Sequence, residues 1–175
     1  MTSRSILFPL VLAFLAAAGA ARARAGGGAP TPADPRAAAA AVLDDWHDAA
    51  ARADEARYFG HFAPDGVFLG TDPGERWTAT EFRAWAKPYF ARGRAWTFRA
   101  HGRHLALSED GRTAWFDERL ATEKMGECRG SGVLTLVGGA WKIALYDLSI
   151  PIPNPLTAAV VRLVAEEGRK SPGPP

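Results

Sequence analysis

Residues 115–119, Trp-Phe-Asp-Glu-Arg, place two carboxylic acids beside two aromatic side chains. The surrounding run, 113–122, is typical of a β-strand, in which successive side chains point to opposite faces. One acid must therefore face inward, and we expect it to be Asp117, which shares its face with Trp115. A carboxyl group buried in an apolar pocket has a raised pKa, which suits it to general acid–base catalysis. The alternative, which the pattern favours, is an inert ion pair between Asp117 and Arg129 of the next predicted strand.

Other reactive residue types are sparse. No set of His, Asp and Glu has the spacing of metal ligands, so we predict neither a metal nor a cofactor. Cys128 is the only cysteine and cannot form an internal disulfide, so a buried, inert thiol is expected. Gly130-Ser131-Gly132 has no helix after it, which indicates a bend in a strand and not a phosphate loop.

Three helices are predicted before the four long strands. Asp34-Pro35 has the residues of an N-cap and a first helical turn, Asp54 can cap a short second helix, and Thr78-x-x-Glu81 is a capping box for a third. We expect the second helix to end at a turn over 63–66, before a short strand at 67–70. Four longer strands follow, joined mostly by short turns: Trp96–Leu107, Thr113–Thr122, Glu127–Val137 and Trp141–Ile150. Helices followed by an antiparallel meander define an α+β protein.

The two ends of the chain have a different character. Residues 1–25 are typical of a cleaved signal peptide, and 26–34 form a Gly/Pro linker, so export to the periplasm or the medium is expected. Residues 155–167 form an amphipathic helix, whose apolar face we expect to dock onto its own domain, the alternative being contact with a partner or a second subunit. Residues 168–175 are predicted to be disordered. No segment after the signal is apolar enough to span a membrane.

The segment YFGHFAPDGVFLGTDPGERWTATEF resembles SnoaL-like proteins of the nuclear transport factor 2-like (NTF2-like) superfamily, as do DGRTAWFDERL and RGSGVLTLVGGAWKIALYDLSIPIPN. The resemblance covers the predicted domain, 35–154. It implies a cone in which helices pack on a curved, mostly antiparallel sheet and enclose a pocket. Relatives include ketosteroid isomerases, polyketide cyclases, dehydratases and non-catalytic binding proteins, so the fold does not specify a reaction.

If the implied pocket is present, each aromatic residue either packs in the core or lines the pocket. We expect the pocket to be lined by a set of aromatic residues and one arginine: Trp46, Tyr58, Phe62, Trp77, Trp85, Tyr89, Trp115, Arg129 and Tyr146. His47 lies beside Trp46 and is the second candidate catalytic residue, as donor or base at the pocket mouth. A histidine beside an apolar helix face is more often an interfacial residue with a satisfied hydrogen bond.

The charge balance argues against nucleic acid as a partner. With the signal peptide, Arg4, Arg22 and Arg24 are lost, so 21 Lys and Arg become 18 against 19 Asp and Glu, and the net charge changes from +2 to −1. Three functions stay open: binding of an apolar or aromatic small molecule, isomerase, cyclase or dehydratase chemistry at Asp117, and a homodimeric interaction module that uses the outer sheet face.

Overall fold

The computed structural model describes residues 34–170, and the side chains of 34–168. The predicted signal peptide, residues 26–33 of the linker and residues 171–175 of the tail lie outside the described residues. The helices are α1 (Pro35–Ala51), α2 (Glu55–Gly60), α3 (Ala79–Phe90), the 3-10 turn η1 (Asn154–Leu156) and α4 (Thr157–Lys170). The strands are β1 (Phe62–Leu69), β2 (Arg76–Thr78), β3 (Arg99–Leu107), β4 (Thr113–Thr122), β5 (Gly126–Val137) and β6 (Ala140–Ser149).

The predicted caps begin all three N-terminal helices. The Asp34 carboxylate accepts a hydrogen bond from the Arg36 amide, and Asp54 accepts one from the Arg57 amide. Thr78 and Glu81 form the reciprocal capping box of α3. These side chains satisfy backbone N–H groups that the first helical turn leaves unpaired, so the helix starts follow from the local sequence.

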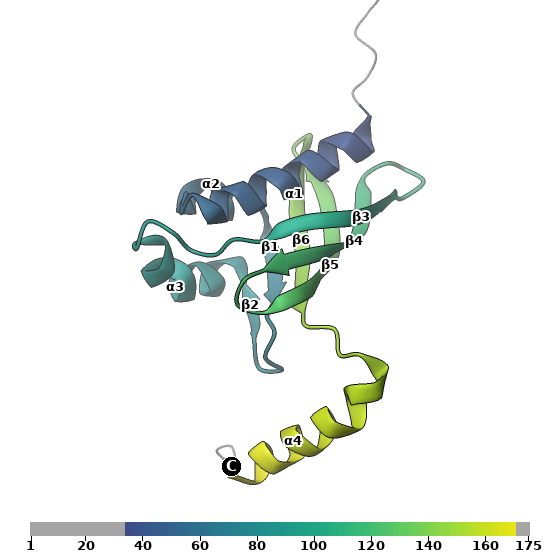
Figure 1. Cartoon of the computed structure of the whole chain (residues 1–175). Helices are drawn as coiled ribbons and strands as arrows, with labels where there is room; N and C mark the ends of the chain where they lie inside the picture. The colour runs from purple at the N-terminus through teal and green to yellow at the C-terminus, as the bar shows by residue number, and fades with distance from the viewer. Residues whose placement is uncertain (1–33, 171–175) are drawn as a thin grey trace, which may run out of the picture. The chain divides into compact units, whose positions relative to one another are not determined.

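The six strands form one mixed sheet in the order β2-β1-β6-β5-β4-β3, which confirms the α+β prediction (Figure 1). The β1–β6 pair is parallel and every other pair is antiparallel. The predicted turn at 63–66 is wrong: α2 ends at Gly60, and these residues form an irregularity within β1. Further register shifts lie in the β3–β4 and β5–β6 pairs. Such irregularities bend strands, and here they curve the sheet toward the helices.

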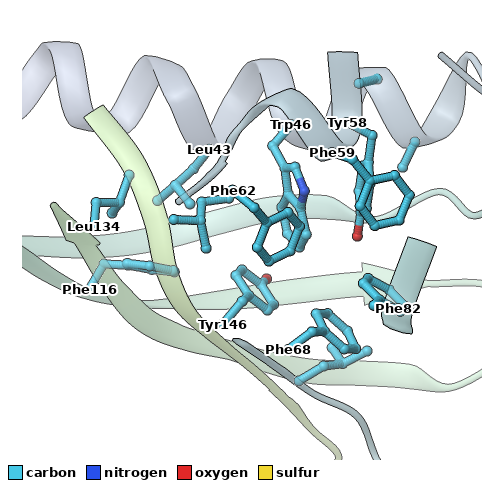
Figure 2. Close-up of a cluster of buried hydrophobic side chains, with 14 of the residues drawn as sticks. Leu43, Trp46, Tyr58, Phe59, Phe62, Phe68, Phe82, Phe116, Leu134 and Tyr146 are labelled. Atoms are coloured by element: carbon cyan, nitrogen blue, oxygen red, sulfur yellow. The ribbon is translucent and has the colours of Figure 1, made fainter. Parts of the chain in front are cut away.

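Aromatic side chains fill the space between the helical layer and the sheet. Figure 2 shows Leu43 and Trp46 pointing from α1 toward the sheet, with Tyr146 of β6 below them. The Trp46 ring stacks on Tyr58 at 4.8 Å between ring centres and contacts Tyr146 at 4.4 Å. Aromatic pairs at these separations add to the stabilisation from buried area, so Trp46 is a central contact of the core.

The C-terminal helix departs from its prediction. It runs from Thr157 to Lys170, three residues further than expected. Its apolar residues Val161, Leu163 and Val164 are 61%, 63% and 66% exposed, which contradicts the prediction that this face docks onto its own domain. Within residues 34–170, none of the helices combines the length and the apolar character needed to cross a bilayer.

Candidate functional site

A cavity of about 220 Å³ is bounded by α1, α2, α3, the inner face of β1 and β6, and the segments before β3 and β5. Nine of the residues that line it are aromatic: Trp46, Tyr58, Phe68, Trp77, Phe82, Trp85, Trp96, Phe98 and Tyr146. The other lining residues include His47 and Glu75, and no lysine or arginine is among them. Apolar walls with a few polar groups are the usual composition of a small-molecule site.

Glu118 is a buried carboxylate that contacts two residues of the cavity lining, His47 and Tyr146. Strand β4 alternates between buried and exposed residues, and Glu118 falls on the buried side, fully inaccessible to solvent. Its Oε1 accepts a hydrogen bond from the Tyr146 hydroxyl at 2.9 Å and lies 2.8 Å from His47 Nε2. Its Oε2 accepts a hydrogen bond from Arg103 Nε at 2.7 Å. A buried carboxylate with this many donors keeps its charge without water.

The surroundings of Glu118 shift two pKa values in opposite directions. Burial alone raises the pKa of Glu118, but the hydrogen bond and charge of His47 and the charge of Arg103 outweigh burial, so this pKa lies below its ordinary value. Burial and the adjacent Glu118 charge both raise the pKa of Tyr146 well above its ordinary value. Glu118 is therefore an anion and Tyr146 a neutral hydrogen-bond donor at neutral pH.

Arg103 connects this charge to the first helix. Besides Glu118, its guanidinium donates a hydrogen bond to the Ala40 carbonyl at 3.0 Å and lies 2.8 Å from Asp44 Oδ1. Ala40 and Asp44 are successive positions on one side of α1, where Arg103 is 13% exposed. The contacts join α1 to β3 and β4, and so hold His47, also on α1, at a set distance from Glu118.

His47 is the histidine of the cavity lining. A carboxylate only accepts hydrogen bonds, so the contact with Glu118 places the ring hydrogen on His47 Nε2. In the neutral ring, Nδ1 then carries the lone pair, and it bonds to no residue within 34–168. His47 is 8% exposed, so the structure combines an oriented imidazole with limited access to water.

The expected orientation of β4 is wrong. Asp117 has a side chain that is 57% exposed and lies 3.3 Å from His104 Nδ1, and Trp115 is 51% exposed. Arg129 is also exposed, and it lies opposite Arg119 and not Asp117. Asp117 is therefore neither the inward acid nor the partner of Arg129, and the inward acid of this strand is Glu118.

A local signal for the correct face was available. Phe116 and Leu120 have the same strand parity as Glu118, and both are buried. Trp115 indicates the opposite face, because a large aromatic residue is typical of the inner face of a sheet, but here it is 51% exposed. Arg103 was also missed, although it shares its parity with Leu105, which packs against the core.

Five of the predicted aromatic residues do lie along the cavity: Trp46, Tyr58, Trp77, Trp85 and Tyr146. Phe62 is buried in the core beside Trp46 without lining the cavity. Tyr89 stacks on Trp85 at 4.8 Å outside the lining. Four lining aromatic residues were not predicted: Phe68, Phe82, Trp96 and Phe98. Gly130 is also part of the site, because a Cβ there would overlap the Tyr146 hydroxyl.

Within residues 34–170, no three His, Cys, Asp or Glu side chains lie close enough together to hold a metal ion. The SnoaL-like domain family matches residues 39–153, and the chain belongs to this family. No curated protein matches the chain significantly.

Solved structures of the same fold include three bacterial proteins. An NTF2-like protein of unknown function from Pseudomonas putida KT2440 is 13% identical, with a TM-score of 0.57 over 68% of this chain and 88% of that one. A candidate calcium/calmodulin-dependent protein kinase II association domain from Xanthomonas campestris is 24% identical, with a TM-score of 0.55 over 72% and 94%. A candidate scytalone dehydratase from Novosphingobium aromaticivorans is 12% identical, with a TM-score of 0.55 over 66% and 83%. These likenesses confirm the predicted NTF2-like fold.

Proposed function

We propose that this protein binds an apolar or aromatic small molecule in the cavity between its helices and sheet. The observation that carries the proposal is the cavity itself, about 220 Å³ in volume and lined mainly by aromatic side chains. An engineered apolar cavity of about 150 Å³ holds benzene. The larger volume here suits a substituted monocyclic or a bicyclic ring compound.

Blocking the cavity mouth tests this proposal. Thr71 is an exposed lining residue, and Thr71→Trp would put an indole ring at the opening. We expect native mass spectrometry to detect a bound small molecule on the wild-type chain and much less on this variant. Thr80→Trp is the matched control, because Thr80 is an exposed residue of α3 outside the lining. Equal ligand occupancy in wild type and both variants would place the binding elsewhere, and an empty wild-type protein that takes up no ring compound would reject the proposal.

The buried His47–Glu118 contact supports a second candidate function, proton transfer in an isomerase, cyclase or dehydratase. Here His47 Nδ1 would accept a proton from substrate, and Glu118 would stabilise the resulting imidazolium across 2.8 Å. Exchange of the C2 protons of 1-indanone in D₂O, followed by proton NMR, tests this function. We expect His47→Gln to abolish protein-dependent exchange and His104→Gln, whose side chain is 79% exposed, to retain it. Absence of protein-dependent exchange in the wild type leaves binding as the function.

Two further proposals concern the state of the protein in the cell. Export rests on the signal-like residues 1–25, and mass spectrometry of the mature N-terminus from fractionated cells would test it.

Homodimerisation through the outer sheet face is supported by Trp115, which is 51% exposed there. Light scattering of wild type and Trp115→Ser at micromolar concentration would test it, and a wild-type monomer would reject it.

A further inference from the structure

Two buried hydrogen-bond donors at the cavity lack a partner. Trp46 Nε1 and the Tyr58 hydroxyl donate no hydrogen bond within residues 34–168, and the two residues are only 2% and 1% exposed. Both residues line the cavity, one from α1 and one from α2, and their rings stack at 4.8 Å. Figure 2 shows the Tyr58 hydroxyl at the end of its ring that points away from α1 and toward the side of Phe82.

Two arginine atoms, Arg57 Nε and Arg103 Nη2, are also buried without a hydrogen bond in the described part of the chain, but neither residue lines the cavity. The Tyr146 hydroxyl, equally buried, donates a hydrogen bond to Glu118 at 2.9 Å. A buried polar group without a partner costs about 1–3 kcal/mol of stability, so folded proteins rarely retain one without a functional or structural reason. Two such donors, on stacked rings of residues that line one cavity, therefore point to an acceptor supplied from outside the chain.

The charge of the surroundings limits what that acceptor is. Burial raises the pKa of Tyr58 well above its ordinary value, and a hydrogen bond from the Trp96 side chain lowers this pKa by less, so Tyr58 keeps its proton. The cavity lining contains the carboxyl residue Glu75 and no lysine or arginine, and the buried anion Glu118 contacts two lining residues. An anionic group would be repelled here, whereas an uncharged oxygen would not.

We propose that Tyr58 and Trp46 form a hydrogen-bond subsite that selects uncharged ring compounds carrying a carbonyl oxygen. The indole N–H and the phenol O–H donate to that oxygen, and the aromatic walls cover the ring. This inference rests on the proposed binding function and names the ligand class that the cavity takes.

A pair of isosteric probes tests the subsite. In 1-indanone a carbonyl oxygen occupies the place that a methylene group has in 1-methylideneindane, so the two differ in acceptor capacity at nearly constant shape. We expect the full-length wild type to bind 1-indanone about three- to tenfold more tightly, the factor that one net hydrogen bond supplies. Isothermal titration calorimetry measures both dissociation constants.

Tyr58→Phe removes one donor and leaves the ring. We expect the preference for 1-indanone to fall about three- to tenfold while the affinity for 1-methylideneindane is unchanged. The unfolding temperature of the empty variant should rise by about 2–4 °C, because the unpaired O–H donor is gone. Tyr89→Phe, which removes a hydroxyl outside the lining, is the matched control and should leave the preference unchanged.

The outcomes separate this inference from the function on which it rests. A wild type that favours 1-methylideneindane, or a Tyr58→Phe variant that keeps the full preference for the ketone, overturns the subsite and leaves apolar binding intact. A wild type that binds neither probe overturns the binding function and the subsite with it.

Discussion

Replacing Glu118 by glutamine removes the charge on which His47, Tyr146 and Arg103 converge. The three donor contacts are 2.7–2.9 Å long, and the Glu118 side chain is fully buried. A glutamine amide has one oxygen, so its NH₂ group must face at least one of these donors. The variant keeps the size of the side chain and changes only its charge and hydrogen bonding.

The size of the effect follows from what the variant leaves unpaired. Removing one partner of a buried ion pair costs about 3–5 kcal/mol, because the other charge stays buried. Arg103 keeps its contacts with Asp44 and the Ala40 carbonyl, so we expect the lower end, about 3 kcal/mol. That loss corresponds to a decrease of about 6–12 °C in unfolding temperature for a domain of this size.

Urea unfolding followed by tryptophan fluorescence measures the effect, since the chain has six tryptophans. We expect the midpoint to fall by about 1–3 M with an unchanged slope. Asp117→Asn is the control, because it removes the neighbouring charge on the same strand where the side chain is 57% exposed. Its stability should change by no more than about 0.5 kcal/mol. Equal losses in both variants, or a Glu118→Gln protein as stable as wild type, would refute the reasoning.

Further predictions concern pH, packing and capping. The pKa of Glu118 is lower in the folded protein than its ordinary value of 4.5, so its stabilising contribution is complete above that pH and is lost as the pH falls through the folded-state pKa. Urea midpoints between pH 3 and 7 should therefore show the difference between wild type and Glu118→Gln shrinking below about pH 4.5. Gly130→Ala would push the Tyr146 hydroxyl away from Glu118 and destabilise the fold by about 1–3 kcal/mol, whereas Gly60→Ala, where a Cβ meets open space, should not destabilise it. Thr78→Ala removes the α3 capping box and should lower the unfolding free energy by about 1 kcal/mol in the same assay.

Helices and strands whose ends are set by neighbouring residues could be predicted accurately. The caps Asp34, Asp54 and Thr78 begin the three helices where expected, because each satisfies backbone groups within three residues of itself. The predicted strand over Thr113–Thr122 has the same first and last residues as β4, since turns that contain glycine flank it. These features depend on residues adjacent along the chain.

The composition of the site depends on contacts between distant residues. Strand parity predicted that one of Asp117 and Glu118 faces inward, but the choice depends on which sheet face the helices cover. That choice is made by burial of Phe116 and Leu120 in the same core cluster as Leu43 of α1, and by Arg103, which reaches Ala40 on that helix from 63 positions away.

Alternating side chains and capping motifs are properties of neighbouring residues, and the chain alone therefore predicted helices, strands and an aromatic-rich interior. The pairing of His47 with Glu118 spans 71 positions, and the unpartnered donors of Trp46 and Tyr58 become visible only when two helices meet over a curved sheet. No local rule contains these distances, because they arise when the sheet bends and closes its inner face against the helices.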